Sequence, residues 1–530
     1  MHRPADPTRC RRLLLVLGIA LGTVLAGAGP ATALDVVAAD PGGLRAGVTF
    51  SPDGDGVADE LAVVAAGAPG ERVRLVVEVA RGLGATSVIA RTRPVAIGRS
   101  GRARLVWDGH GGGRLLSDGP YVARVCTSAG ACAADRVAVH LRVLAAAIAT
   151  QRSFAPGETV PLLIQGDQQR VAVGLAPDDA RPGTPPTEAV TLAPGRRRYA
   201  LPRDIAPGLY RLVVTDGTRA GWRGLPLLVR APALTSPPPG VTLVVLPALT
   251  WAVYNEYDAD RDGRPDSHYE TPGSAVTRLG VPYETAGLTA PGSAGREQDA
   301  GHTDGFMRTW RLLGGANALP ATFVTDLQLA RLPAAVLRRY AALLFLGHGE
   351  YYTRAEFERI RAYQTGGGDF LYGSANGFYA LTEVRGDAVR LLARPQRTPA
   401  LNDALITAVQ YTGCCWSVGS PGPLLVTAAG LRAAPWAFRG TGLRAGDVLA
   451  YAGGEIDGFG PQTPPGLTVL AELDWRAPDR PIQSGAMVLA RRAGGGRVFA
   501  PGTMGFIDGT ARNARLRRVF GNVWSRFAAE

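Results

Sequence analysis

The residues best suited to chemistry lie at the ends of two apolar segments in the second half of the chain. His348 and Glu350 follow the apolar run ALLFLG, and Asn376 follows the run DFLYGSA. An imidazole transfers protons near neutral pH, and a carboxylate binds cations or accepts protons. Open α/β sheets bind their ligands beyond the carboxyl ends of the strands. We therefore expect Glu350 and Asn376 to face the same edge of one sheet.

The segment between these residues predicts a strand, a helix and a second strand. The run ALLFLG shows no apolar–polar alternation, which is typical of a strand buried on both faces of a parallel sheet. Thr353 then begins a helix as its N-cap, with Glu356 in the matching position of a capping box. Apolar residues follow at helical spacing: Phe357, Ile360 and Tyr363. The glycines at 366–368 end the helix.

An acidic loop earlier in the chain has the spacing of a calcium site. The phrase DADRDGRPD places four carboxylates at positions one, three, five and nine of such a loop: Asp258, Asp260, Asp262 and Asp266. Gly263 falls at the sixth position, where the sharp turn lies, but Tyr269 replaces the usual acidic twelfth residue. We expect a calcium loop of the extracellular type, with a solvated acidic turn as the alternative. A second acidic cluster fits a turn better than calcium: Asp53, Asp55 and Asp59.

Several phrases in the second half of the chain are similar to those of one known family. They are WAVYN, SHYETP and VTD, followed by GHGEYYT and GSANGFYALT, which are the most specific. On these phrases, residues 240–528 resemble the carboxy-terminal domain of the large (beta) subunit of N,N-dimethylformamidase. The resemblance implies a glutamine-amidotransferase-like α/β fold. It also implies an amidohydrolase with a mononuclear iron held by two tyrosines and one glutamate.

The resemblance assigns the iron ligands to particular residues. Glu350 of GHGEYY would be the glutamate, Tyr254 of WAVYN the first tyrosine and Tyr269 of SHYETP the second. The two tyrosines are closer in sequence than in the family, so Tyr257 or Tyr283 stays open as the second ligand. Phenolate and carboxylate are hard oxygen donors that suit Fe(III). In the alternative interpretation the tyrosines only pack and Glu350 only caps a neighbouring group.

The same resemblance places His348 and Asn376 beside the metal, where they would position the substrate. A bound metal would polarise an amide carbonyl and activate a water, and His348 would move the proton. Gly349 stands where the family often has an acidic residue, and Tyr352 stands where it often has tryptophan. The pocket is therefore expected to differ from that of the family.

The cysteines predict one disulfide and no nucleophile. Cys126 and Cys132 flank TSAGA between two strand-like runs, so we expect a disulfide that closes a hairpin. Cys414 and Cys415 are adjacent in the loop-like phrase TGCCWS, and a vicinal disulfide or a metal role stays open. The chain has no GxCxG-like turn and no GxSxG elbow, which argues against a cysteine or serine nucleophile.

Length and composition indicate an exported protein with several domains. A chain of 530 residues suggests about three or four domains. Residues 1–33 have the basic start, apolar centre and ATA ending of a signal peptide, and export through the secretory or the twin-arginine route stays open. No later stretch has the roughly 18 consecutive apolar residues of a membrane span. The net charge of +12 is spread along the chain without a nucleic-acid motif, which argues against nucleic-acid binding.

Two β-rich segments precede the α/β segment. Residues 34–145 contain short strand-like runs between turn residues, which predicts a β-sandwich. Their phrases FSPDGDGVADE and LVWDGHGGGRLLSDGPYVARV resemble the flagellar hook-capping type of immunoglobulin-like domain. Residues 146–234 predict a second immunoglobulin-like sandwich, and the proline-rich residues 235–240 a linker. In 241–530, strands and helices alternate, which predicts an α/β domain with a mostly parallel sheet. We expect its first strand over VTLVVLPALTW, with Tyr254 following the end of that strand.

The sequence therefore predicts an exported amidohydrolase that cleaves a C–N bond of a small amide with a metal-activated water. The alternative is a non-catalytic extracellular or cell-surface protein that uses the same fold to bind a ligand or glycan. Iron, and calcium in the acidic loop, are the expected metals. An oligomer or a companion subunit is compatible with either interpretation.

Overall fold

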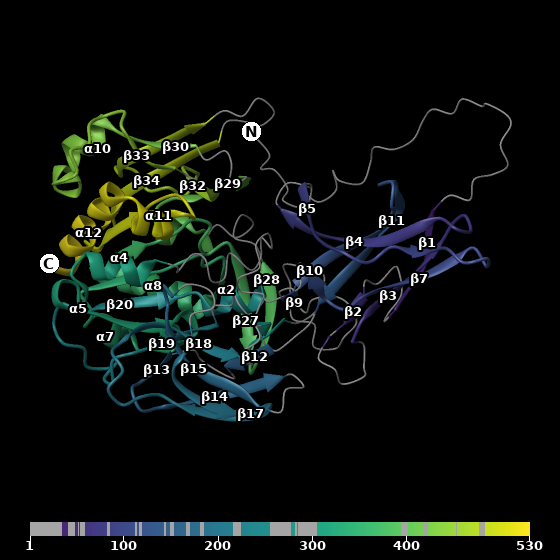
Figure 1. The fold of residues 1–530 in the computed structure, drawn as a ribbon. Helices are drawn as coiled ribbons and strands as arrows, with labels where there is room; N and C mark the ends of the chain where they lie inside the picture. The colour runs from purple at the N-terminus through teal and green to yellow at the C-terminus, as the bar shows by residue number, and fades with distance from the viewer. Residues whose placement is uncertain are drawn as a thin grey trace.

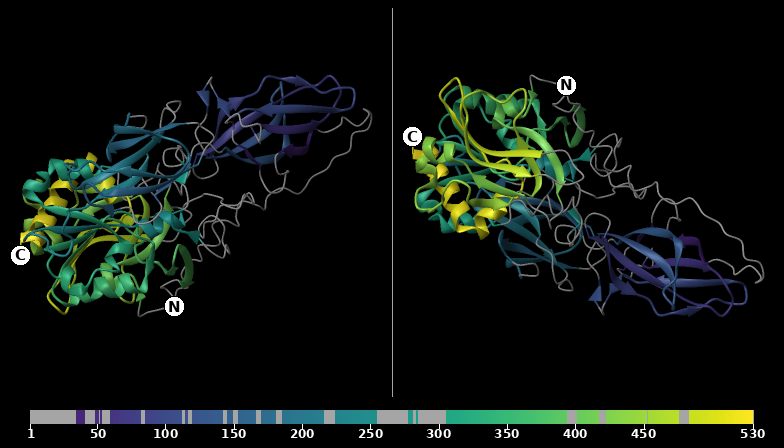
Figure 2. Two further views of the ribbon diagram at one scale, coloured as in Figure 1. Left: turned by 90° about the horizontal axis from the view of Figure 1, so that it is seen from below. Right: turned by 90° about the horizontal axis from the view of Figure 1, so that it is seen from above.

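The first β unit of the molecule stands apart from the rest of the chain (Figures 1 and 2). The computed structural model describes residues 34–40, 48–50, 52, 59–81, 85–111, 114–115, 119–141, 145–148, 153–165, 170–180, 185–215, 224–254, 277–280, 283–284, 305–393, 401–416, 422–451, 453–475 and 483–529. The expected signal peptide, residues 1–33, lies outside them.

Two sheets form the first β unit around a single core. One has the order β1-β3-β7: Asp35–Asp40, Leu61–Ala66 and Arg102–Trp107. The other has the order β2-β11-β10-β4-β5, with β6 also paired to β4: Val48–Phe50, Cys132–Leu141, Gly119–Thr127, Arg72–Arg81, Ala85–Arg91 and Val95–Ala96. A small β8–β9 ribbon completes the unit: His110–Gly111 and Arg114–Leu115. The Trp107 ring packs edge-on against Phe50 and Tyr121, with centroids 5.4 and 5.8 Å away.

The predicted disulfide is confirmed at the end of the β10–β11 hairpin. Cys126 and Cys132 are bonded to each other and are paired in the strand register, with their Cα atoms 3.9 Å apart. The bond therefore closes a short local turn of the first β unit and does not cross-link distant parts of the chain.

A second β-rich region packs directly on the carboxy-terminal part of the chain. Its first sheet has the order β17-β14-β12-β22: Gly195–Ala200, Thr159–Gln165, Ala145–Ile148 and Tyr283–Glu284. The second has the order β13-β19-β18-β15-β16: Ser153–Phe154, Leu225–Val229, Gly208–Thr215, Val171–Pro177 and Thr187–Leu192. The Ser153 hydroxyl donates to the Phe323 carbonyl (2.9 Å), and the Ala231 N–H donates to the Thr322 hydroxyl (2.8 Å). One hydrophobic core runs through both regions.

A nine-stranded sheet organises the carboxy-terminal part of the chain. Its order is β23-β20-β24-β26-β35-β34-β33-β30-β31: Ala321–Thr325, Thr242–Leu246, Ala342–Phe345, Asp369–Tyr372, Arg497–Ala500, Gln483–Arg491, Thr468–Trp475, Pro423–Val426 and Val448–Tyr451. Pairing is parallel from β23 to β35 and antiparallel from β35 to β31. The sheet is therefore mixed, whereas the sequence predicted a mostly parallel one. The tight turn between β34 and β35, closed by Arg492 N–H to Gly496 O at 2.8 Å, allows only antiparallel pairing there.

Both faces of the parallel strands are buried, as the apolar run ALLFLG predicted. Leu344 of β24 faces a core that contains Phe520 and Trp524 of α12 (Ala514–Ala529). The neighbouring Leu343 and Phe345 face another core, with the apolar side chains of α8 (Arg354–Thr365). The remaining helices are short: α4 Phe306–Leu312, α5 Gly315–Ala318, α6 Asp326–Leu329, α7 Ala334–Leu337, α9 Ala404–Thr407, α10 Ala428–Ala433, η3 Pro435–Phe438 and α11 Phe506–Arg512. No helix in the described ranges is long and apolar enough to cross a membrane.

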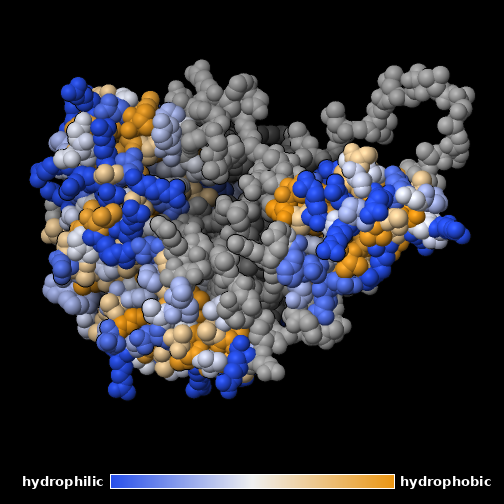
Figure 3. All heavy atoms as spheres, in the orientation of Figure 1, coloured by the Kyte–Doolittle hydropathy of each residue, from blue (hydrophilic) through white to orange (hydrophobic). Residues whose placement is uncertain are grey.

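The capping box at Thr353 is confirmed. The Glu356 N–H donates to the Thr353 hydroxyl at 3.2 Å, the Glu356 carboxylate accepts from the Thr353 N–H at 3.3 Å, and Gly366 is the C-cap. The surface in view in Figure 3 has hydrophobic and hydrophilic residues interspersed.

Two local predictions differ from the structure, and one short strand was not predicted. The strand expected over VTLVVLPALTW ends at Leu246, because Pro247 starts helix α2 (Ala248–Val253), so Tyr254 follows a helix rather than a strand. The residues directly after Glu350 form a short strand, β25 (Tyr351–Thr353), in a sheet with the order β21-β28-β27-β25; the other strands are Thr277–Arg278, Ala388–Ala393 and Ala380–Arg385. The phrase TGCCWS lies in strand β29 (Gln410–Trp416), which pairs with β32 (Gly454–Gly458), and not in a loop.

Candidate functional site

Tyr254 and Glu350 meet beyond the carboxyl ends of the parallel strands. Strand β20 leads into α2 and then Tyr254, and β24 leads into the turn that carries Glu350. The Tyr254 hydroxyl donates a hydrogen bond to the Glu350 carboxylate, although the two residues are 96 positions apart. Both side chains are buried, with exposures of 2% and 7%. Two of the three residues expected to bind iron are therefore in direct contact.

His348 and Asn376 lie in the same site and share a partner that the sequence did not reveal. The Glu455 carboxylate lies 2.8 Å from His348 Nε2, and the same oxygen accepts from Asn376 Nδ2 at 2.8 Å. Asn376 Nδ2 is also 3.4 Å from His348 Nε2, and the Tyr254 ring centroid is 5.8 Å from that of His348. The site thus combines Tyr254, Glu350, His348 and Asn376 with Glu455 of β32.

The two turns that carry these residues are tied to each other. The Phe378 N–H donates to the Gly349 carbonyl at 2.8 Å, and the Tyr379 N–H donates to the Glu350 carbonyl at 2.9 Å. Asn376 has a φ of 51°, an uncommon backbone conformation that clusters at functional sites, and its N–H donates to the Asp457 carboxylate at 2.8 Å. The turn that holds Asn376 is therefore fixed from two sides.

The glycine at position 349 is required by packing. A Cβ atom there would lie 2.4 Å from the Phe345 ring, which is itself buried in the core. An acidic side chain at this position would displace Phe345. Because Phe345 at the end of β24 fills this space, position 349 carries glycine instead of the acidic residue expected from the resemblance.

The helix that carries Tyr254 is held by two hydrogen bonds at its start. The Leu249 N–H donates to the Asp326 carboxylate at 3.0 Å, and the Thr250 hydroxyl accepts from the Tyr351 N–H at 3.0 Å. The Tyr254 and Tyr351 rings then pack edge-on at 5.9 Å. These contacts fix α2 against the strand that follows Glu350.

Two carboxylates act on the protonation of His348. Burial by itself lowers the pKa of the imidazole, but the charge and hydrogen bond of Glu455, with the charge of Glu350, outweigh it and raise the pKa above its usual value. Around this group, burial and the charges of Glu455, Tyr379, Glu350 and Asp457 raise the pKa of the Tyr411 hydroxyl. The site is thus rich in negative charge, which favours a cation.

Three buried carboxyl groups make the stability of the protein depend on pH. Burial raises the pKa of Asp403 to about 7, and burial with neighbouring carboxylates raises the pKa values of Glu356 and Asp457. Because the folded state then holds protons that the unfolded chain has lost above about pH 4, stability falls as pH rises through about 7. We expect a higher Tm at pH 5 than at pH 8, with Asp403 contributing on the order of 3 kcal/mol to the difference in unfolding free energy between these two pH values.

The variant Asp403→Asn controls for this effect, because it removes one of the titrating groups. Whatever its absolute stability, we expect its Tm to change less between pH 5 and pH 8 than that of the unaltered protein. Calorimetry at the two pH values measures both. A Tm that is equal or higher at pH 8 in the unaltered protein would contradict the prediction.

Several predicted metal ligands fall outside the described residues. They are Tyr257 and Tyr269, the acidic loop Asp258, Asp260, Asp262 and Asp266, and Asp53 and Asp55. The backbone of Tyr283 lies in β22, where it pairs with Ala146 of β12. Within the described ranges, no group of three His, Cys, Asp or Glu side chains is arranged to hold a metal ion. The metal hypothesis therefore depends on the phenol and carboxylate oxygens of Tyr254 and Glu350.

Sequence reasoning missed Glu455 because no local pattern marks it. It lies in the phrase GGEIDGFG, which resembles a turn-rich surface segment, and it reaches the site only because β32 bonds to the turn after β35. In that contact the Met504 N–H donates to the Glu455 carbonyl at 3.0 Å, and the Asp457 N–H donates to the Gly502 carbonyl at 3.1 Å. The signal that could have indicated a functional role is the presence of two acidic residues, Glu455 and Asp457, in a segment of small residues.

One protein family matches most of the carboxy-terminal part of the chain. The family described as N,N-dimethylformamidase beta subunit-like, C-terminal, matches residues 194–515. The match begins between β16 and β17, so it includes the later strands of the second β-rich region. A search of curated proteins finds no match.

Two of the solved structures that this chain matches are only weakly similar to it. A Salmonella alpha-2-macroglobulin reacted with methylamine is 12% identical, with 39% of this chain and 17% of that chain covered and a TM-score of 0.17. The protein SGBP-B of Bacteroides ovatus, in complex with a mixed-linkage heptasaccharide, is 16% identical, with 40% and 51% covered and a TM-score of 0.17. The chain thus spans about a sixth of the first and half of the second. Likenesses this weak carry no argument about function.

Proposed function

Because this chain belongs to the N,N-dimethylformamidase beta subunit-like, C-terminal family, we propose that it hydrolyses the C–N bond of a small amide where Tyr254, Glu350 and His348 meet. The observation that carries the proposal is the contact between the Tyr254 hydroxyl and the Glu350 carboxylate, beside a His348 that is bonded to Glu455. A carboxylate, a phenol and an oriented imidazole beyond the ends of parallel strands are the parts that hydrolysis requires.

The residues present fit a single hard cation such as iron. The Glu350 carboxylate and the Tyr254 phenol oxygen already converge, and Tyr254 would become an anionic ligand by losing its proton to bind the ion. Tyr269 remains the expected third ligand. The negative charge that raises the pKa of His348 also favours a cation here. A bound ion would supply Lewis-acid chemistry, which polarises the amide carbonyl and acidifies a water.

His348 is the residue suited to move the proton. Its Nε2–H donates to Glu455, which orients the ring and leaves Nδ1 as the basic nitrogen of the neutral imidazole. In amide hydrolysis a proton must leave the attacking water and reach the departing nitrogen, so one imidazole can serve both steps. Asn376 bonds to the same oxygen of Glu455 and therefore holds this carboxylate in place.

Three wider inferences accompany this proposal. The parallel run from β23 to β35, with the site at its carboxyl ends, supports a glutamine-amidotransferase-like fold for the carboxy-terminal domain. The basic and apolar start of the chain supports export. The spacing of the acidic loop, Asp258 to Asp266, supports calcium binding next to the second expected tyrosine.

Hydrolysis of a panel of small amides tests the proposal. Purified protein with its metal content measured is incubated with formamides, acetamides and anilides, and the released amine is quantified. We expect release from at least one class and none from the Glu350→Gln variant. Iron-loaded protein that releases no amine, yet binds a ligand with equal affinity in the variant, would contradict hydrolysis and favour the binding-protein alternative.

A further inference from the structure

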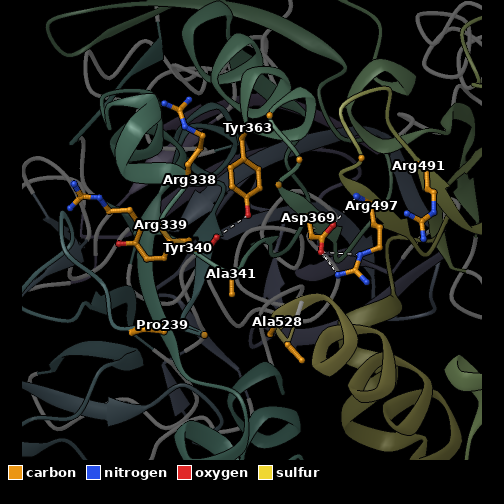
Figure 4. Close-up of a pocket in the computed structure, with 16 residues that line it drawn as sticks. Pro239, Arg338, Arg339, Tyr340, Ala341, Tyr363, Asp369, Arg491, Arg497 and Ala528 are labelled. Carbon is orange, nitrogen blue, oxygen red and sulfur yellow. Dashed lines mark hydrogen bonds and ion pairs between the residues drawn. The ribbon is translucent and has the colours of Figure 1, made fainter.

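A pocket of about 640 Å³ lies at the opposite edge of the nine-stranded sheet from the candidate site (Figure 4). It is bounded by Gly240 and Ala341, which precede β20 and β24, and by Asp369 and Arg497, which begin β26 and β35. These are the amino ends of strands whose carboxyl ends carry Tyr254 and Glu350. The pocket is therefore separate from the amide site, and its volume is in the range of small-molecule sites.

Among the described residues that line the pocket, four are arginines and one, Asp369, carries a carboxylate. Figure 4 shows Arg338 and Arg339 on one side and Arg491 and Arg497 on the other. The carboxylate, Asp369, is bonded to Arg497: it accepts from the Arg497 N–H at 2.7 Å, from Nε at 2.9 Å and from Nη2. Asp369 therefore compensates Arg497 alone, and the other arginines leave an excess of positive charge.

Two of these arginines are available to a ligand. Arg338 and Arg491 are exposed, and neither guanidinium group forms a hydrogen bond or ion pair within the described ranges, although both backbones are hydrogen-bonded. Arg339 is partly engaged, since its Nη1 donates to the Thr235 carbonyl at 2.8 Å. Because arginine side chains are long, the free guanidinium groups can turn toward an anion held between the two sides.

Two further arginines, Arg361 and Arg492, add positive charge near this end of the sheet without lining the pocket. Burial and the neighbouring charge of Arg361 lower the pKa of Arg492 to about 10, and Arg492 follows Arg491 directly. Cations that crowd a concave surface without carboxylate partners raise the local concentration of anions. Backbone N–H groups of the glycine turn are not available to bind an anion. Those of Gly366, Gly367 and Gly368 all donate to carbonyl groups at the end of α8.

We propose that this pocket binds a small oxyanion ligand with at least two phosphate, sulfate or carboxylate groups. Guanidinium groups recognise these groups through paired hydrogen bonds. Because Arg338 and Arg491 approach from opposite sides, a ligand with anionic groups at both ends engages both, whereas a single small anion engages one. The proposal is independent of amide hydrolysis, since no residue of that site lines the pocket.

Calorimetric titration with pyrophosphate, citrate and inorganic phosphate, at constant ionic strength, tests the proposal. The test variant is Arg338→Gln with Arg491→Gln. The matched control is Arg196→Gln with Arg198→Gln, which removes two exposed arginines of β17 that are remote from the pocket. We expect pyrophosphate or citrate to bind the unaltered protein and the control equally, and the test variant at least tenfold more weakly.

The relative affinities of the three anions distinguish a specific binding site from general attraction of anions to a positively charged protein. Phosphate should bind at least tenfold more weakly than the ligands with two or more anionic groups. Equal weakening in both double variants would overturn the proposal, because it would show only net charge. Absence of binding by all three anions would overturn it as well. Pyrophosphate binding without citrate binding would support a phosphate ligand, and the reverse a carboxylate ligand.

Discussion

Replacing Glu350 by glutamine should remove the bound metal and amide hydrolysis together. The substitution keeps the size of the side chain but replaces the anionic oxygen that accepts from the Tyr254 hydroxyl. A neutral amide is a much weaker ligand for a hard cation. We expect kcat/KM to fall on the order of 10³-fold or more, which is about 4 kcal/mol of transition-state stabilisation. Steady-state kinetics and elemental analysis of the same preparation measure the two effects.

The variant Tyr352→Phe is the matched control for this experiment. Tyr352 lies two residues after Glu350 and is fully buried, but its hydroxyl donates to the Leu401 carbonyl at 3.0 Å, away from the site. We expect it to keep metal and turnover and to lose about 1 kcal/mol of unfolding free energy. Full activity in Glu350→Gln, or equal loss in Tyr352→Phe, would contradict the assignment.

Replacing Glu455 by glutamine should reduce turnover and leave the metal bound. The variant loses the charge beside His348 Nε2, and its amide can present an N–H where the imidazole and Asn376 both need an acceptor. A histidine in the wrong tautomer or orientation loses most of its value as an acid and base, so we expect kcat to fall by about 10²–10⁴-fold. Kinetics with elemental analysis distinguish this positioning role from that of a ligand.

Glu472→Gln is the control for Glu455, because Glu472 is an exposed glutamate on strand β33, which belongs to a different sheet from β32. It should behave as the unaltered protein in both measurements. If Glu455→Gln lost its metal in parallel with activity, Glu455 would be a ligand and the site would have to be redrawn. If it kept full activity, the proposed orientation of His348 would be wrong.

Local sequence patterns predicted those parts of the site that depend on interactions between residues close together in the chain. The apolar run before His348 forms a strand buried on both faces, and the Thr353 and Glu356 pair forms the capping box that starts α8. Because strand, turn and helix are adjacent in the chain, their residue types alone indicated that His348 and Glu350 lie at a sheet edge.

The features that local patterns did not predict depend mainly on contacts between segments far apart in the chain. Glu455 enters through the bonding of β32 to the turn after β35, which no local pattern specifies. The antiparallel half of the sheet also depends on one longer-range pairing, between β30 and β33, in which Leu424 lies opposite Leu473, 49 positions later. Tyr254 was expected at the end of a strand, but Pro247 stops that strand and the buried ALTWAV segment becomes helix α2. A periodicity argument cannot separate a short buried helix from a short buried strand.

The metal content of the purified protein shows whether Tyr254 and Glu350 bind iron. We expect about one iron per chain, accompanied by a visible absorption band from tyrosinate-to-iron charge transfer that is lost in Tyr254→Phe. Protein that hydrolyses amides while it contains neither iron nor this band would contradict the assignment of Tyr254 and Glu350 as metal ligands.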